Sequence, residues 1–168
     1  MIVVDYNGTG IWTVDAVISR YSTYVERYRI SSPRDLKPKV QVQDERQWIY
    51  PVMDEVIEAI EDGDLACAEI GIEFIEEDAS FPFGKILKSN TARALRRAAL
   101  TDEQKERIRL RVVGMLKAGY LPREYRQYAK LARKIGLGKS FPQIKDELAT
   151  DNPWVQHYYR YFEEHACH

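Results

Sequence analysis

Helix start and stop signals recur along this chain, and they constrain its fold more than any other feature. The run Thr101-Asp-Glu-Gln104 has the form of a capping box, in which the Thr101 side chain accepts from the backbone N–H of Gln104. Gly119 and Gly136 stand where helices end, and Asn152-Pro153 is typical of a helix start. Because apolar residues recur at spacings of three and four between these signals, the sequence predicts an all-α fold.

The same signals place the individual helices. We expect helices over residues 14–29, 52–62, 64–78, 82–99, 101–118 and 122–135, and two more that begin at Pro142 and Pro153. Residues 2–6 and 11–14 flank the turn signal Asn7-Gly8 and predict a short N-terminal β-hairpin. Residues 31–44 contain two prolines and predict a connecting loop, after which Asp44 is expected to cap a helix.

The helix starts also repeat. Phe81-Pro82 and Leu121-Pro122 lie 40 residues apart, and Phe141-Pro142 follows after 20. The 40-residue offset also pairs Ile72 with Val112. In this spacing, residues 52–150 resemble a short HEAT or armadillo array. The resemblance implies a right-handed stack of antiparallel helix pairs, whereas an irregular helical bundle explains the same pattern and stays open.

Length and composition predict one helical domain over residues 1–168. It divides into an N-terminal helix region (1–30), a loop (31–44), acidic helices (45–83), basic helices (84–139) and aromatic C-terminal capping helices (140–168). The sequence shows no secretory signal and no apolar run long enough for a membrane span. Cys67 and Cys167 form no disulfide framework, so a cytoplasmic location is expected.

Charge is strongly polarised along the sequence. Residues 84–139 contain sixteen basic and four acidic side chains, whereas residues 41–83 contain thirteen acidic and one basic. Each segment thus carries twelve net charges, of opposite sign. Nine cationic residues at helical spacing are predicted to form one outward-facing wall that binds a polyanion or a protein partner: Arg93, Arg96, Arg97, Arg107, Arg111, Arg123, Arg126, Lys130 and Arg133. Solvated helix faces, or ion pairs with the acidic segment, are the alternatives.

The C-terminal segment is rich in aromatic residues. Trp154, Tyr158, Tyr159, Tyr161 and Phe162 lie within one predicted helix. We expect them to seal the end of the core, with an exposed subset free to act as a contact surface.

Three further patterns suggest chemistry but are incomplete. The stripe Glu69, Glu73 and Glu76 could bind a cation, although an exposed acidic face is the expectation. The residues before Ser140 resemble the end of a phosphate-binding P-loop but lack its first glycine. A cluster of zinc-ligand residue types lies at the C-terminus: His157, His165, Cys167 and His168. The sequence therefore supports no metal, cofactor or catalytic residue.

The sequence favours a non-enzymatic interaction module that binds a macromolecular partner, or itself, through opposed acidic and basic faces. The alternative is a nucleic-acid-binding protein that uses residues 93–139, as in HEAT-like DNA-repair proteins. A metal-dependent enzyme built on the glutamate stripe is a third hypothesis.

Overall fold

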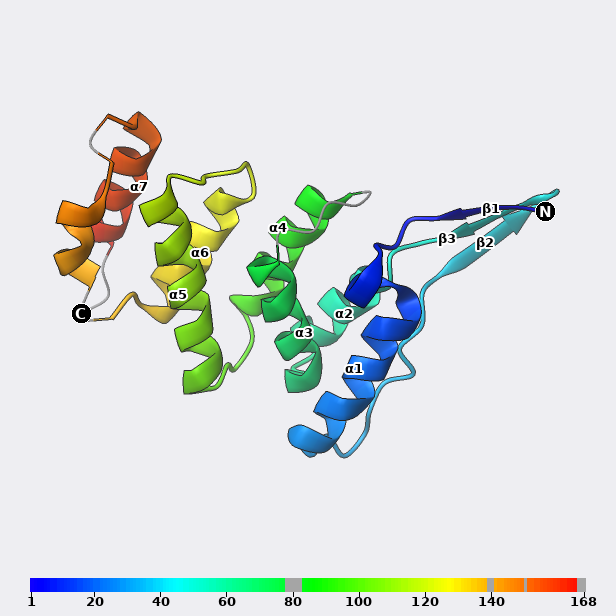
Figure 1. The fold of residues 1–168 in the computed structure, drawn as a ribbon. Coiled ribbons are helices and arrows are strands. Elements are labelled where there is room, and N and C mark those ends of the chain that lie inside the picture. Colours follow the sequence, from blue (N-terminus) through cyan, green and yellow to red (C-terminus); the bar gives the residue numbers. More distant parts are fainter. Residues whose placement is uncertain (78–82, 139–140, 150, 166–168) are drawn as a thin grey trace. The chain divides into compact units, whose positions relative to one another are not determined.

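The computed structural model describes residues 1–77, 83–138, 141–149 and 151–165. These residues form two compact units, Met1–Leu100 and Thr101–His168, which are described separately below. Both units are mainly helical, and the first also contains a small sheet (Figure 1). Within the described ranges, every helix is too short or too polar to span a bilayer.

Helix α3 is the centre of the first unit. It spans Leu65–Glu76 and packs against α1 (Val14–Arg27), α2 (Val52–Glu61) and α4 (Gly84–Leu95). Its buried residues run on all sides of the helix, as expected of a helix that packs against several others. Gly71 permits the close packing, because a Cβ there would lie 2.8 Å from Cδ1 of Ile60.

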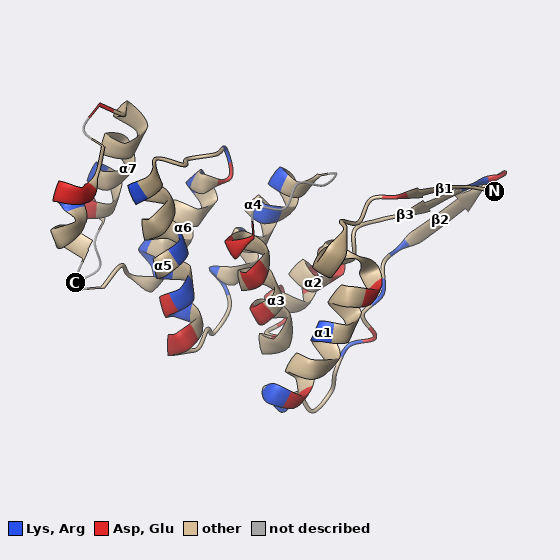
Figure 2. Ribbon diagram, in the orientation of Figure 1, with Lys and Arg blue, Asp and Glu red and all other residues tan. Residues whose placement is uncertain are grey.

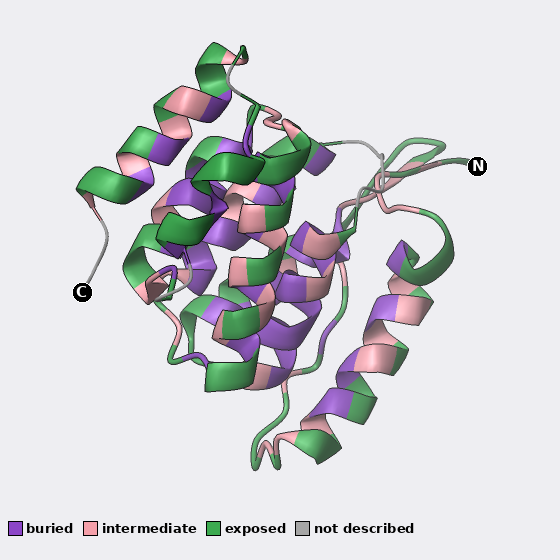
Figure 3. Cartoon of the chain, turned by 60° about the vertical axis from the view of Figure 1, so that its left-hand side comes forward, coloured by how far each residue is buried: buried purple, intermediate pink, exposed green. Residues whose placement is uncertain are grey.

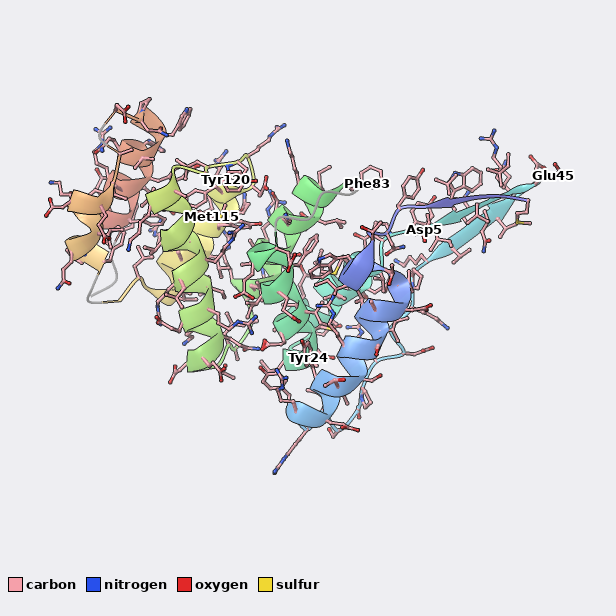
Figure 4. All side chains as sticks on the ribbon, in the orientation of Figure 1. Asp5, Tyr24, Glu45, Phe83, Met115 and Tyr120 are labelled. Carbon is pink, nitrogen blue, oxygen red and sulfur yellow. The ribbon has the colours of Figure 1, made fainter. Side chains whose placement is uncertain are left out.

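Helix α1 covers α3 with one face only. Thr13 caps its N-terminus by accepting from the Ala16 N–H at 3.2 Å. Val17, Tyr21 and Tyr24 are buried, whereas the opposite face is exposed (Figure 3). In Figure 4, Tyr24 lies on the side of α1 that faces α3. The prediction of an amphipathic helix from Val14 is confirmed, with the end at Arg27.

The expected N-terminal hairpin is wrong in its pairing. Strand β1 (Ile2–Asp5) pairs in parallel with β3 (Arg46–Ile49), and β3 pairs antiparallel with β2 (Val40–Gln43), in the order β1-β3-β2. The segment after Asn7-Gly8 instead forms a 3₁₀ turn, η1 (Gly10–Trp12). Trp12 of this turn is buried against Phe74 of α3 with ring centroids 4.9 Å apart, so this segment packs on the helices instead of pairing with β1.

The expected loop over residues 31–44 therefore ends in a strand, and Asp44 caps no helix. Asp44 lies in the turn of the β2–β3 hairpin with a positive φ of 54°. Aspartate tolerates this conformation better than most residues, which suits it to the turn. The labelled Glu45 marks this turn in Figure 4.

The second unit begins with α5 (Asp102–Ala118), which is followed by α6 (Tyr125–Ile135), the 3₁₀ segment η2 (Phe141–Glu147) and α7 (Pro153–Glu164). Both halves of the predicted capping box at Thr101 are present, and Gly119 ends α5 with a positive φ. The helix expected from Pro142 is instead the 3₁₀ segment. The predicted helix start at Pro82 lies outside the described residues.

The core of the second unit lies where α5, α6 and α7 meet. Ile108 and Leu116 of α5, Tyr125 and Tyr128 of α6, and Phe162 of α7 are almost fully buried. The prediction of a mainly helical protein is confirmed, with the small sheet as an addition. The HEAT-like stack, which would span both units, stays a prediction.

Candidate functional site

A groove of about 600 Å³ opens between α6 and α7 of the second unit. One wall is cationic, and the other is aromatic. Leu121, Pro122 and Ala129 also line it. Of the nine predicted binding residues, the groove brings together three.

The cationic wall consists of Arg123, which precedes α6, and of Arg126 and Lys130 on α6. Their spacing of three and four places them on one face of the helix. Both arginines are exposed, and Lys130 is half-buried. Figure 2 shows this concentration of basic residues on α5 and α6.

The opposite face of α6 fixes this wall in place. Tyr125, Tyr128 and Leu131 are buried, as their spacing predicts. The Tyr125 hydroxyl donates to the backbone oxygen of Val112 on α5 at 2.9 Å. Burial raises the pKa of Tyr125, so this hydroxyl keeps its proton.

Arg109 on α5 holds the other end of α6. Its Nε donates to the backbone oxygen of Gly136 at 2.7 Å, and one of its terminal nitrogens donates to that of Ile135 at 3.1 Å. A cation at a helix C-terminus satisfies carbonyls that have no partner within the helix. Arg109 is therefore a structural member of the basic segment.

The aromatic wall belongs to α7. Trp154, His157, Tyr158 and Tyr161 line the groove, and Val155, Tyr159 and Phe162 on the other side of the helix are buried. Asn152 caps α7, because its side-chain oxygen accepts from the N–H groups of Trp154 and Val155 at 3.0 and 3.3 Å.

The rings of this wall support one another through edge-to-face contacts. Tyr158 packs against the buried Tyr125 with ring centroids 4.8 Å apart, and His157 lies 5.1 Å from Tyr158. Trp154 lies 5.8 Å from His157 and is 63 % exposed, an unusual state for tryptophan. The wall is thus anchored at Tyr158 and open at Trp154.

The electrostatics of the groove favour an anion. Burial raises the pKa of Tyr158, and the charge of nearby Arg126 opposes this shift only in part. Tyr158 is therefore a neutral phenol at physiological pH and can donate a hydrogen bond. No carboxylate is found among the described residues that line the groove. The site can accept negative charge on one wall and a flat apolar group on the other.

The other six predicted residues lie elsewhere. Arg133 is on α6, one turn beyond Lys130, with its guanidinium 6.0 Å from the ring centre of Tyr161. Arg107 and Arg111 are half-buried on α5. Three belong to the first unit, at the end of α4 and directly after it: Arg93, Arg96 and Arg97. A single wall across both units stays a prediction.

The expectation that Glu69 and Glu73 form an exposed acidic face is wrong. Glu69 is buried, 3.8 Å from the Arg27 guanidinium, and accepts from the Tyr28 hydroxyl at 3.2 Å. Glu73 lies 3.3 Å from the guanidinium of Arg20. The reason is that α1 packs over this side of α3 and supplies both arginines, which the spacing of the glutamates alone does not reveal.

Three other acidic residues of this unit also have cationic partners. Arg34 contacts Asp62 at 2.7 Å and Glu58 at 3.5 Å, and Lys39 lies 3.8 Å from Glu55. These cations precede the acidic segment instead of following it. The N-terminal region therefore supplies much of the charge that balances the acidic helices.

No metal site is found in the part of the chain that the structure describes. It contains no group of three or more His, Cys, Asp or Glu side chains arranged to hold an ion. Cys167 and His168 of the C-terminal cluster of zinc-ligand residue types, and Lys139 and Ser140 of the partial P-loop, lie outside the described residues.

The sequence predicted the cationic stripe of α6 and an exposed aromatic subset, but not that the two meet. The available signal was the recurrence of Trp154, His157, Tyr158 and Tyr161 at helical spacing, separate from the stripe of Val155, Tyr159 and Phe162. No protein-family model matches the chain, and no curated protein or solved structure matches it either.

Proposed function

We propose that this chain is a non-enzymatic helical binding module that takes an anionic macromolecule in the groove between α6 and α7. The observation that carries the proposal is the cationic wall of Arg123, Arg126 and Lys130, together with the lack of a carboxylate among the described lining residues.

The grouping of these cations has an energetic consequence. Like charges at helical spacing destabilise a helix by about 0.2–0.5 kcal/mol per pair, and a polyanion relieves this repulsion. Binding also releases the counterions that had condensed on the polyanion, which favours association at low salt. Arginine adds bidentate contacts to phosphate or carboxylate oxygens.

The basic surface is a better candidate for partner binding than the acidic one. Glu58, Asp62, Glu69 and Glu73 have ion-pair partners within the first unit. Within the described residues, Arg123 and Arg126 are exposed and have no ion pair. This contrast favours an external anion as the ligand of the groove.

The test uses the full chain and inorganic polyphosphate as the probe, with binding measured by isothermal titration calorimetry. Reversing two groove charges in Arg126→Glu/Lys130→Glu is expected to lower the affinity by at least about tenfold. The matched control is Arg93→Glu/Arg97→Glu, which makes the same change in charge at two exposed positions of the first unit. This control is expected to bind as the parent does.

Equal losses in the two variants would mean that charge alone decides binding and would overturn the groove as the site. Absence of binding by the parent chain at low salt would overturn the proposed function itself. Circular dichroism of each variant confirms that the helices are retained.

The salt dependence of the affinity reports how many cations contact the polyanion. For a single-stranded polyanion, the logarithm of the affinity falls with the logarithm of the salt concentration with a slope of about −0.7 per cation engaged. Three groove cations therefore predict an affinity loss of about 20-fold between about 50 and 200 mM salt. Nine cations, the full predicted wall, would give a loss of several thousandfold by the same relation.

A further inference from the structure

Resting on the proposed function, we infer that the ligand of the groove is a single-stranded nucleic acid. Its phosphates contact Arg123, Arg126 and Lys130, and its bases stack against the aromatic wall of α7 that begins at Trp154. The inference adds to the proposed function the chemical class of the ligand and a role for the aromatic wall.

The two walls have matching lengths. The cationic residues extend from Arg123 to Lys130 and the aromatic residues from Trp154 to Tyr161, which is seven positions in each case. At 1.5 Å per helical residue, the aromatic wall on α7 is about 10 Å long. Successive nucleotides in a stacked strand lie about 3.4 Å apart, so the groove accommodates two or three of them. Its volume of about 600 Å³ is that of a small-molecule site and agrees with this length.

The aromatic wall distinguishes nucleic acid from a simple polyanion. Polyphosphate satisfies the cations but leaves Trp154, which is 63 % exposed, in water. A base that stacks on an aromatic side chain contributes about 1–3 kcal/mol, whatever its identity. Only a ligand with both charge and flat rings uses both walls.

A single strand suits the groove better than a duplex does. In a duplex the bases are paired and stacked inside, so the groove would meet phosphates alone. In a single strand the base faces are open and can reach Trp154 while the backbone follows α6. Tyr158, a neutral donor next to Arg126, adds a hydrogen bond to phosphate or base without repelling either.

An acidic peptide is the competing ligand, since its carboxylates also pair with arginine. It lacks a regular row of flat rings at the spacing of the aromatic wall. Stacking is therefore the property that separates the two ligands experimentally.

The experiment compares four probes on the full chain by fluorescence anisotropy or competition: oligothymidylate of about ten nucleotides, a duplex of equal length, polyphosphate and polyglutamate. Oligothymidylate is expected to bind most tightly. Trp154→Ala is expected to weaken its binding by about 5- to 150-fold, the equivalent of one lost stacking contact, without changing the binding of polyphosphate.

Two further variants make the result specific. Trp154→Phe keeps a ring and is expected to recover part of the affinity. Leu110→Ala removes a side chain on α5 that is 66 % exposed and does not line the groove, so it is expected to bind as the parent does.

The outcomes separate the inference from the function on which it rests. If polyphosphate binds, but oligothymidylate binds no better than duplex and Trp154→Ala has no effect, the inference is overturned and the proposed function stands. Tighter binding of polyglutamate than of oligothymidylate also overturns it, in favour of an acidic protein partner. If no probe binds, both fail.

Discussion

Arg109→Ala is expected to destabilise the second unit, although Arg109 lies in the basic segment and resembles its neighbours in sequence. The substitution removes two hydrogen bonds from a charged donor to the backbone oxygens of Gly136 and Ile135 at the end of α6. It also removes the contact with Glu106 at 3.2 Å. The backbone oxygens at the C-terminal end of α6 then lose these donors.

The magnitude follows from these contacts. A hydrogen bond that involves a charged group contributes about 1.5–3 kcal/mol to folding stability. We expect each bond here to contribute about 1–1.5 kcal/mol, because water reaches this helix end. Two such bonds therefore contribute about 2–3 kcal/mol, and the partly exposed pair with Glu106 adds at most a few tenths. A loss of this size increases the population of the locally unfolded form of α6, from which its amides exchange, by about 30- to 150-fold.

Hydrogen exchange measured by mass spectrometry is the suitable assay, because peptides from residues 101–168 report on this unit separately from the first. Peptides of α6 should lose protection by that factor in Arg109→Ala. Arg109→Lys, which keeps the charge but not the two-pronged geometry, should lie between parent and alanine.

The matched control is Arg126→Ala, which removes the same charge from an exposed position on α6. We expect its protection to change by less than the equivalent of about 0.5 kcal/mol, although it weakens polyanion binding. Unchanged exchange in Arg109→Ala, or equal losses in both variants, would refute the division into structural and ligand-binding arginines.

Three further predictions concern single residues within the units: a buried glycine, a helix cap and a buried thiol. Gly71→Ala should be less stable than Gly114→Ala by about 1–3 kcal/mol in urea unfolding, because a Cβ at Gly71 meets buried side chains whereas one at Gly114 meets nothing within 4 Å. Asn152→Ala should cost about 1 kcal/mol through loss of the α7 cap, and Asn152→Asp should not. Burial raises the pKa of the Cys67 thiol, so this thiol should resist disulfide reagents until the first unit unfolds. Because the folded pKa is the higher one, stability should fall as the pH rises above about 8.5, and Cys67→Ala should reduce that slope.

Several features that depend on neighbouring residues were predictable from the sequence. The capping box at Thr101, the cap at Asn152 and the helix stop at Gly119 all occur as expected. Each depends on backbone groups within a few residues, so no tertiary contact is needed to specify it.

Features that depend on distant partners were not predictable in this way. Strand β1 pairs with β3, which lies more than forty residues later in the sequence. Strand β3 also pairs with β2, which lies in the segment that was expected to be a loop because of its prolines. Short strands with little burial carry no clear alternation of apolar residues, so the sequence offered no pattern to pair them.

The candidate site shows the same division. The stripe of Arg123, Arg126 and Lys130 follows from helical spacing alone. Its position beside the aromatic face of α7 depends on the packing of α6 and α7, which helical spacing does not encode. Glu69 and Glu73 were misjudged for the same reason, because the arginines of α1 that pair with them are far away in sequence.

The central claim is that the anion binds in the groove between α6 and α7. The most direct measurement is a titration of the isotopically labelled full chain with polyphosphate, followed by two-dimensional NMR of the backbone amides. We expect the largest chemical-shift changes within residues 121–130 and 153–161, the segments that form the two walls. Shifts that are largest around Arg93 to Arg97, or in the β-sheet, with the groove unaffected, would contradict it.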